Sequence, residues 1–220
     1  GINIVDDEVY ITDRSDHVAV KFTLDGKPIQ VIGERGVFSD TGCENPGDLC
    51  PRAAGPFNYC TEMSTSPSGD IYISDGYRNA RVHRFSSEGR LIHSWGQPGK
   101  DSPGEFHLVH SLLVDPDGKV YVCDRANRRV QIFSPEGEFI TMWTGMGGPD
   151  NIVRDSEGIF YIAEQADESG DSHVSIWDAD GTVLERWPIR HAHGLEIDAN
   201  GDIYLGLTIE QSVDKYVRQR

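Results

Sequence analysis

Basic residues are scarce in this sequence. The 220-residue chain carries 20 lysines and arginines against 36 acidic residues, so its formal net charge is −16 at pH 7. A field of that sign repels nucleic acid and anionic lipid, and we expect neither as a partner. Long apolar runs are also missing, and with hydrophobic residues at 37% no membrane-spanning segment is expected. The length suits one domain with a sizeable core.

Cysteine is rare as well, with four residues in the chain. Cys43 and Cys50 share one Gly/Pro-rich loop, "SDTGCENPGDLCPRAAGPF". They either close a small disulfide loop, which would favour an extracytoplasmic or secreted location, or remain two free thiols. Cys60 and Cys123 lie near predicted strands and are expected to be packing residues.

Helical periodicity is nearly absent, and a strand pattern recurs instead. "PSGDIYISDGYRNARVHRFSSEGRLIHSWG" and "PDGKVYVCDRANRRVQIFSPEGEFITMWTG" show it most clearly. Alternating apolar residues, β-branched side chains and Gly-containing turns predict antiparallel meanders. Meanders of about 40 to 50 residues, arranged radially, make an all-β propeller of four-stranded blades. The single domain, 1–220, divides into repeats at about 1–33, 55–96, 104–145, 147–187 and 190–220, with an insertion loop at 34–54.

The two ends of the chain do not supply a complete set of strands. The first repeat begins inside its first strand, and "VDKYVRQR" predicts a third strand with no fourth after it. We therefore expect a five-bladed variant or a fragment of a six-bladed propeller. In both cases a strand edge is exposed, and such an edge invites self-association.

A register argument identifies the residues around the central axis. The second strands are expected at Val9–Asp13, Ile71–Asp75, Val120–Asp124, Phe160–Glu164 and Ile203–Gly206. In a meander, the start of the first strand and the end of the second lie on the same face. The residues at the start of the first strands are Thr61, His110, Asp150 and His193, and the equivalent in the first repeat would precede Gly1.

Two imidazoles in this register predict a metal site. In a six-bladed parent, the axial residues of repeats one, three and five would be about 120° apart, which suits a zinc tripod with an open position. The alternative is that His110 and His193 are ordinary hydrogen-bonded histidines. His107 is three residues before His110, so in a strand it points to the other face.

The loops after the second strands reach the same face. "SDGYRN" presents Tyr77 there, and "CDRANR" presents Arg125, while Arg14 stands in the same "DR" context as Arg125. The aspartates that end these strands recur from repeat to repeat. Asp75 and Asp124 are therefore expected mainly to hydrogen bond to neighbouring backbone.

The segments "SDGYRNARVHRFSSEGRLIHSWG", "GEFHLVHSLLVDPDGKVYVCDRANRRVQIF" and "HAHGLEIDANGDIYLG" resemble the NHL-repeat β-propeller family, over almost the whole chain. Within it, they are similar to the peptidyl-α-hydroxyglycine α-amidating lyase branch. That resemblance implies zinc held by His110 and His193, and cleavage of a C–N bond to release an amide and glyoxylate. It gives Tyr77 and Arg125 catalytic roles, as proton acceptor and carboxylate partner. The register of the repeats adds Asp150 and Thr61 as auxiliary residues.

Several positions depart from the family pattern. Val109 and Ala192 replace the proline before each histidine, and Arg78 replaces a disulfide cysteine after Tyr77. Gly194 stands where the family has an aspartate tied to a structural calcium, which argues against calcium here. Because the third histidine would precede Gly1, we expect weak zinc binding and feeble lyase activity unless Asp150, a water or another chain completes the site.

Two other functions fit the same sequence. A non-catalytic NHL propeller would bind a protein or peptide partner on this face, and a metal-dependent, lactonase-like hydrolase would act on a small molecule. Fold alone does not separate them, because one propeller fold hosts many functions. Stoichiometric zinc would favour the metal-binding enzymes over the binding module.

Overall fold

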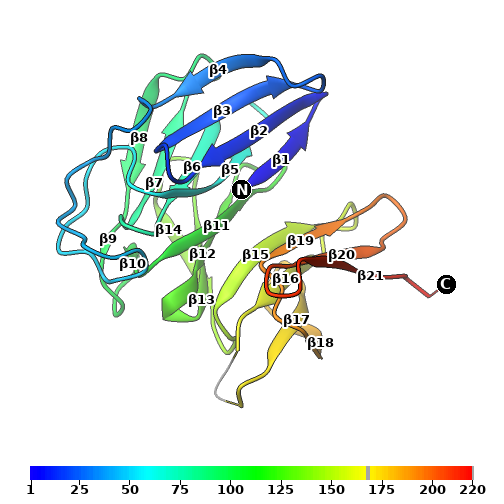
Figure 1. Ribbon diagram of the computed structural model, residues 1–220. Helices are drawn as coiled ribbons and strands as arrows, with labels where there is room; N and C mark the ends of the chain where they lie inside the picture. Colours follow the sequence, from blue (N-terminus) through cyan, green and yellow to red (C-terminus); the bar gives the residue numbers. More distant parts are fainter. Residues whose placement is uncertain (167–168, 220) are drawn as a thin grey trace.

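The computed structural model describes residues 1–166 and 169–219. These residues form five antiparallel sheets arranged radially around one axis, a five-bladed β-propeller (Figure 1). Blades 1 to 4 have four strands each and blade 5 has three. In this part of the chain one short 3-10 helix (η1, Arg125–Asn127) is present, and no helix has the length and hydropathy of a membrane span.

The strands follow one another across each blade in sequence order. Blade 1 contains β1 (Ile2–Val5), β2 (Glu8–Asp13), β3 (Val18–Thr23) and β4 (Pro28–Ile32), and blade 2 contains β5 (Cys60–Thr65), β6 (Ile71–Asp75), β7 (Arg81–Phe85) and β8 (Leu91–Trp95). Blade 3 contains β11 (Val109–Val114), β12 (Val120–Asp124), β13 (Arg129–Phe133) and β14 (Phe139–Trp143). Blade 4 contains β15 (Pro149–Arg154), β16 (Phe160–Glu164), β17 (Ser172–Trp177) and β18 (Val183–Ile189), and blade 5 contains β19 (Gly194–Ile197), β20 (Ile203–Leu207) and β21 (Ser212–Tyr216). A short parallel pair, β9 (Gln97–Pro98) and β10 (Glu105–Phe106), lies between blades 2 and 3.

Each of the five predicted second strands lies in a separate sheet, as β2, β6, β12, β16 and β20. The prediction of separate meanders is therefore confirmed. The register also places the residue at the start of each first strand opposite the end of its second strand: Val109 pairs with Asp124 and Pro149 with Glu164.

A recurring aspartate turn joins the first and second strands of a blade. Asp115 accepts hydrogen bonds from the backbone of Asp117 and Lys119, both at 2.9 Å, and Tyr121 donates its hydroxyl to the other carboxylate oxygen at 3.2 Å. Gly118 has a φ of 84°, which a residue with a side chain rarely adopts. The same arrangement recurs at Asp155 and Asp198. Local turn chemistry thus fixes the hairpin that carries each axial residue.

The hydrophobic core consists of layers between neighbouring blades. Phe57, Met63 and Ile73 fill the layer between blades 1 and 2, and Tyr121 and Phe160 are in the layer between blades 3 and 4. Two further layers join blades 2 and 3 and blades 4 and 5. Burying each large apolar side chain contributes about 1.5–3 kcal/mol, so contact between successive blades stabilises the arc as a whole.

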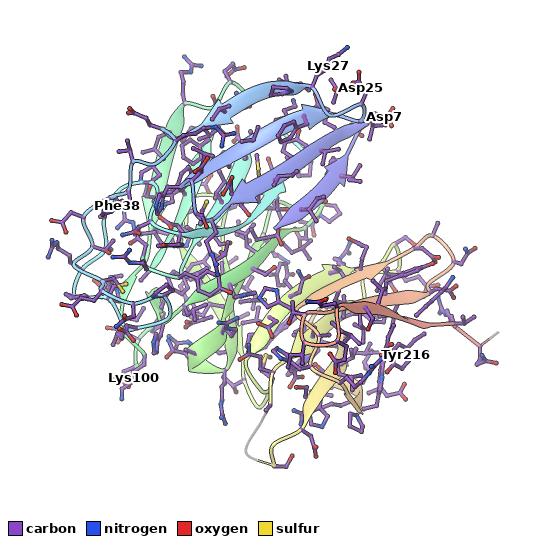
Figure 2. All side chains as sticks on the ribbon, in the orientation of Figure 1. Asp7, Asp25, Lys27, Phe38, Lys100 and Tyr216 are labelled. Carbon is purple, nitrogen blue, oxygen red and sulfur yellow. The ribbon has the colours of Figure 1, made fainter. Side chains whose placement is uncertain are left out.

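The open sector of the arc lies between blade 1 and blade 5. A cavity of about 830 Å³ is lined there by β1 residues and by β19 and β20, and it extends to the axial residues. Ile2 and Ile4 on β1 and Val213 on β21 are more than half exposed at its margins. Tyr216, labelled in Figure 2, is the last residue of β21, the outer strand of the three-stranded blade.

Candidate metal and catalytic site

The structure brings the four axial residues to one end of the central opening. Thr61 in β5, His110 in β11, Asp150 in β15 and His193 just before β19 all line the 830 Å³ cavity. His110, Asp150 and His193 form a group whose nitrogen and oxygen atoms lie within 4.8 Å of one another. They come from blades 3, 4 and 5, so the site depends on the packing between blades.

Three atoms that could bind a metal ion form a compact triangle: the Nε2 atoms of His110 and His193 and the hydroxyl oxygen of Tyr77. The Nε2 atoms of His110 and His193 are 3.1 Å apart. The Tyr77 hydroxyl lies 2.9 Å from the first and 3.4 Å from the second. Tyr77 belongs to the loop between β6 and β7 in blade 2, so its side chain crosses to the axis from another direction.

The orientation of His110 is fixed by its second ring nitrogen. Nδ1 lies 2.6 Å from the backbone carbonyl oxygen of Asp150, which can only accept a hydrogen bond. The proton is therefore on Nδ1, and the lone pair of Nε2 points toward His193 and Tyr77. A backbone carbonyl bound to the outer nitrogen is the usual support for a metal-binding histidine.

Both imidazoles are held in their neutral form. Burial lowers the pKa of His110 well below its usual range, and Arg125 and His193 lower it further. Burial also lowers the pKa of His193, although the carboxylate of Asp150 opposes this effect. Neutral imidazole is the form that binds a metal ion.

The Asp150 carboxylate faces other side chains. Its Oδ1 accepts a hydrogen bond from Arg125 at 2.8 Å and one from Gln165 at 3.3 Å. Its Oδ2 lies 3.3 Å from Nε2 of His191. Asp150 is fully buried, so this ion pair with Arg125 is shielded from solvent.

Arg125 and Arg14 flank the Tyr77 ring. The guanidinium carbon is 5.4 Å from the ring centroid for Arg125 and 5.1 Å for Arg14. The sequence indicates a role for Arg14 only through the "DR" context that it shares with Arg125. Its contact with Tyr77 spans two blades and leaves no local sequence signal.

Thr61 and His107 have structural contacts. The Thr61 hydroxyl hydrogen bonds to Ser74 and donates to the Val109 carbonyl oxygen at 2.9 Å, which joins blades 2 and 3. His107 points away from the axis, and its Nε2 donates to the Gly47 carbonyl oxygen at 3.0 Å. His107 lies before β11 and not within it, and Leu108 between them has a φ of 66°, so the strand alternation assumed for His107 and His110 does not apply.

The insertion loop contacts the segment that holds Tyr77. The backbone N–H of Gly47 donates to the Tyr77 carbonyl oxygen at 2.6 Å. Cys43 and Cys50 are buried, unbridged thiols whose sulfur atoms lie 3.6 and 3.7 Å from the carbonyl oxygen of Asp48. Burial, followed by the neighbouring Cys43, raises the pKa of the Cys50 thiol.

Carboxylates at the ends of the second strands hold the segments that precede the axial residues. Asp75 accepts from the backbone of Asn58 at 2.9 Å, Asp124 from His107 at 2.8 Å, and Glu164 from Gly147 at 2.7 Å. Each is fully buried. These bonds to backbone agree with the structural role predicted for Asp75 and Asp124.

The sequence of the chain is similar to those of several known proteins. A model of the NHL repeat matches residues 106–133. The chain is 28% identical to human NHL repeat-containing protein 3, over 97% of this chain and 64% of that protein. It is 27% identical to a probable peptidyl-α-hydroxyglycine α-amidating lyase of Caenorhabditis elegans, over 90% of this chain and 57% of that protein. The chain thus spans roughly three fifths of the length of these relatives.

Solved structures show the same fold at lower identity. A catalytically inactive variant of virginiamycin B lyase from Staphylococcus aureus, with quinupristin, superposes with a TM-score of 0.66 at 15% identity, over 99% of this chain and 69% of that one. The repeat match, the relatives and the blade architecture agree. The chain is an NHL-like β-propeller that is similar in sequence to NHL repeat-containing protein 3 and to amidating lyases.

Proposed function

We propose that the axial cluster is a zinc centre serving a C–N lyase of the peptidyl-α-hydroxyglycine α-amidating type. The observation that carries this proposal is the donor triangle of His110, His193 and Tyr77, with edges of 2.9, 3.1 and 3.4 Å. Two nitrogens bound to one tetrahedral zinc at about 2.05 Å are about 3.3 Å apart. The spacing and the neutral imidazoles therefore fit one shared cation.

His110 and His193 would hold the zinc, with Tyr77 at its edge. When bound, zinc supplies a Lewis acid that polarises a substrate oxygen and favours loss of its proton. Asp150 supports the site because its backbone carbonyl oxygen accepts a hydrogen bond from the Nδ1–H group of His110. The Asp150 carboxylate accepts a hydrogen bond from Arg125, so it influences the site through Arg125 rather than as a zinc ligand.

In the proposed reaction, Tyr77 acts in its phenolate form and accepts the hydroxyl proton of the carbinolamide. The electron pair of that O–H bond forms the carbonyl of glyoxylate, and the C–N bond breaks. The electron pair of the C–N bond goes to the amide nitrogen, which takes the same proton back from Tyr77 to give the peptide amide. No redox partner is needed, because the products together contain the atoms and electrons of the substrate.

A pair of histidine variants tests the proposal. Zinc content by elemental analysis and turnover of an N-acyl-α-hydroxyglycine should both fall by more than about 100-fold in His110→Ala, since a ligand is lost. His107→Ala removes a histidine three residues away that points to the insertion loop, and it should leave both within twofold. Zinc-free wild-type protein, or equal turnover in His110→Ala and wild type, would contradict the proposal.

A binding role is the second candidate, and the exposed apolar margin of the cavity favours it. Ile2, Ile4 and Val213 are 66%, 61% and 65% exposed around the opening between blades 1 and 5. Exposed apolar side chains gathered around a cavity are typical of partner-binding surfaces. A wild-type protein that takes up no zinc would favour this role over the lyase.

A further inference from the structure

Three arginines lie close to Tyr59 and Tyr77 on this face of the propeller: Arg14, Arg78 and Arg125. Arg14 follows β2 and Arg125 follows β12, at equivalent positions in blades 1 and 3, on either side of Tyr77. Arg78 follows Tyr77 directly, and its guanidinium carbon is 5.4 Å from the Tyr59 ring centroid. Each could serve an anionic substrate, so the free hydrogen-bonding capacity of each guanidinium decides between them.

Arg125 and Arg78 are already engaged. Arg125 forms a 2.8 Å ion pair with the buried Asp150, and its side chain is only 13% exposed. Arg78 donates from Nε and Nη2 to the backbone carbonyl oxygen of Cys43, the Nε distance being 3.0 Å. Binding of a substrate carboxylate to Arg125 would compete with Asp150, and breaking a buried ion pair is costly.

Arg14 is different, because its charge is uncompensated. Within residues 1–166 and 169–219, its contacts are the faces of Tyr77 and Tyr59, with the guanidinium carbon 5.1 and 5.8 Å from the ring centroids. The nearby carboxylates of Asp13 and Asp16 pair with Arg35 instead, at 3.8 and 2.6 Å. Arg14 is exposed to solvent at the rim, with its N–H groups available.

We propose that Arg14 binds the carboxylate of the substrate above the Tyr77 ring, an inference that rests on the proposed lyase function. A guanidinium matches a carboxylate with two parallel N–H donors. The two tyrosine rings hold it in place by cation–π contact, so little side-chain freedom is lost on binding. Arg14 would thus determine specificity for an acid over its neutral amide, while Arg125 maintains Asp150 beneath the site.

Two probes that differ by one charge test this assignment. N-benzoylglycine carries the carboxylate, and N-benzoylglycinamide is its neutral counterpart. In zinc-loaded protein, Arg14→Gln should weaken N-benzoylglycine binding at least about tenfold by calorimetry. It should leave amide binding and zinc content within twofold, and Arg14→Lys should recover part of the loss.

Arg90→Gln is the matched control, because it removes the same charge at the other end of a blade. Arg90 lies in the turn between β7 and β8, with its side chain 81% exposed and 3.5 Å from Glu88. It should change the binding of neither probe. Absence of N-benzoylglycine binding in wild type, an equal loss for both probes in Arg14→Gln, or a loss confined to Arg125→Gln would overturn the proposal.

Turnover separates this inference from the proposed function. If Arg14→Gln raises KM for N-benzoyl-α-hydroxyglycine with kcat unchanged, both stand. If wild type has no turnover but binds N-benzoylglycine in an Arg14-dependent way, the carboxylate site stands and the lyase does not. Turnover with an unchanged KM in Arg14→Gln supports the lyase and rejects the assignment of Arg14.

Discussion

At the scale of single residues, burial decides the protonation state of several groups. Burial lowers the pKa of the His110 and His193 imidazoles and raises the pKa of the Cys50 thiol, so each group favours its neutral form. Removing a group from water penalises its charged form whatever its chemistry. The two axial imidazoles therefore favour the form with an unprotonated ring nitrogen, which is the form that binds a cation.

Tyr121 links this effect to stability at high pH. Burial, followed by the charge of Asp115, raises the pKa of Tyr121 above its ordinary value of about 10. The unfolded chain then releases the phenolic proton at a lower pH than the folded protein. The stabilisation is complete below about pH 10 and is lost as the pH rises further.

Tyr121→Phe should expose this dependence. At pH 8 the variant should lose about 1 kcal/mol in free energy of unfolding, because the hydrogen bond to Asp115 is gone. Between pH 10 and 11.5 its stability should fall less steeply than that of wild type in urea titrations. Tyr216→Phe removes an exposed phenol on β21 and serves as the control; parallel wild-type and Tyr121→Phe profiles would refute the argument.

Sequence reasoning reached part of this residue-scale picture. Register within the repeats sufficed to bring His110 and His193 to one place, because the turn between the first and second strands has the same length in blades 3 and 5. The loop after a second strand reaches the same face, which placed Tyr77 beside them. It could not show that Asp150 pairs with Arg125, or that Arg14 lies on Tyr77. Those contacts join different blades, and their distances depend on the angle between blades, which no local pattern encodes.

At the scale of the strand, buried carboxylates at the ends of the second strands of blades 2, 3 and 4 hold the segments that lead into the first strands. Asp124 accepts hydrogen bonds from the His107 backbone, Asn127 and Arg129, each at 2.8 Å. Arg129 is itself buried. The recurrence of an aspartate at the end of β2, β6 and β12 made this role predictable, and Glu164 takes the same role in blade 4.

Asp124→Ala should be strongly destabilising. The substitution leaves the Arg129 guanidinium buried without its carboxylate, and loss of one partner of a buried pair costs about 3–5 kcal/mol. The free energy of unfolding, measured with urea, should fall by that amount. Asp25→Ala removes an exposed turn aspartate and should stay within about 0.5 kcal/mol; equal effects of the two substitutions would refute the role assigned to Asp124.

At the scale of the whole molecule, blade 5 differs from the others because β21 is its outer strand. Blades 1 to 4 place a fourth strand at that position. The sequence predicted this difference, because its last segment supplies one strand fewer. Among the described residues no strand pairs with the outer edge of β21, and Val213 on this strand is 65% exposed.

Val213→Lys should reduce self-association through this edge. A lysine on an exposed edge strand opposes pairing with a second chain. In sedimentation velocity, wild type should associate as its concentration rises, and the variant should need about tenfold more protein to reach the same state. Val183→Lys places the same charge on β18, which is also an outer strand; an equal effect of the two substitutions would reject β21 as the site of association, and a wild type that stays monomeric throughout would contradict the prediction.

The layered core also has a consequence for the axial site. Tyr77, His110 and His193 belong to blades 2, 3 and 5, so the distances among them depend on every layer of side chains packed between blades 2 and 5. A change in the angle between any two of these blades would move one of the three side chains relative to the others. The packing that stabilises the propeller and the geometry of the atoms that could bind a cation are therefore set by the same contacts.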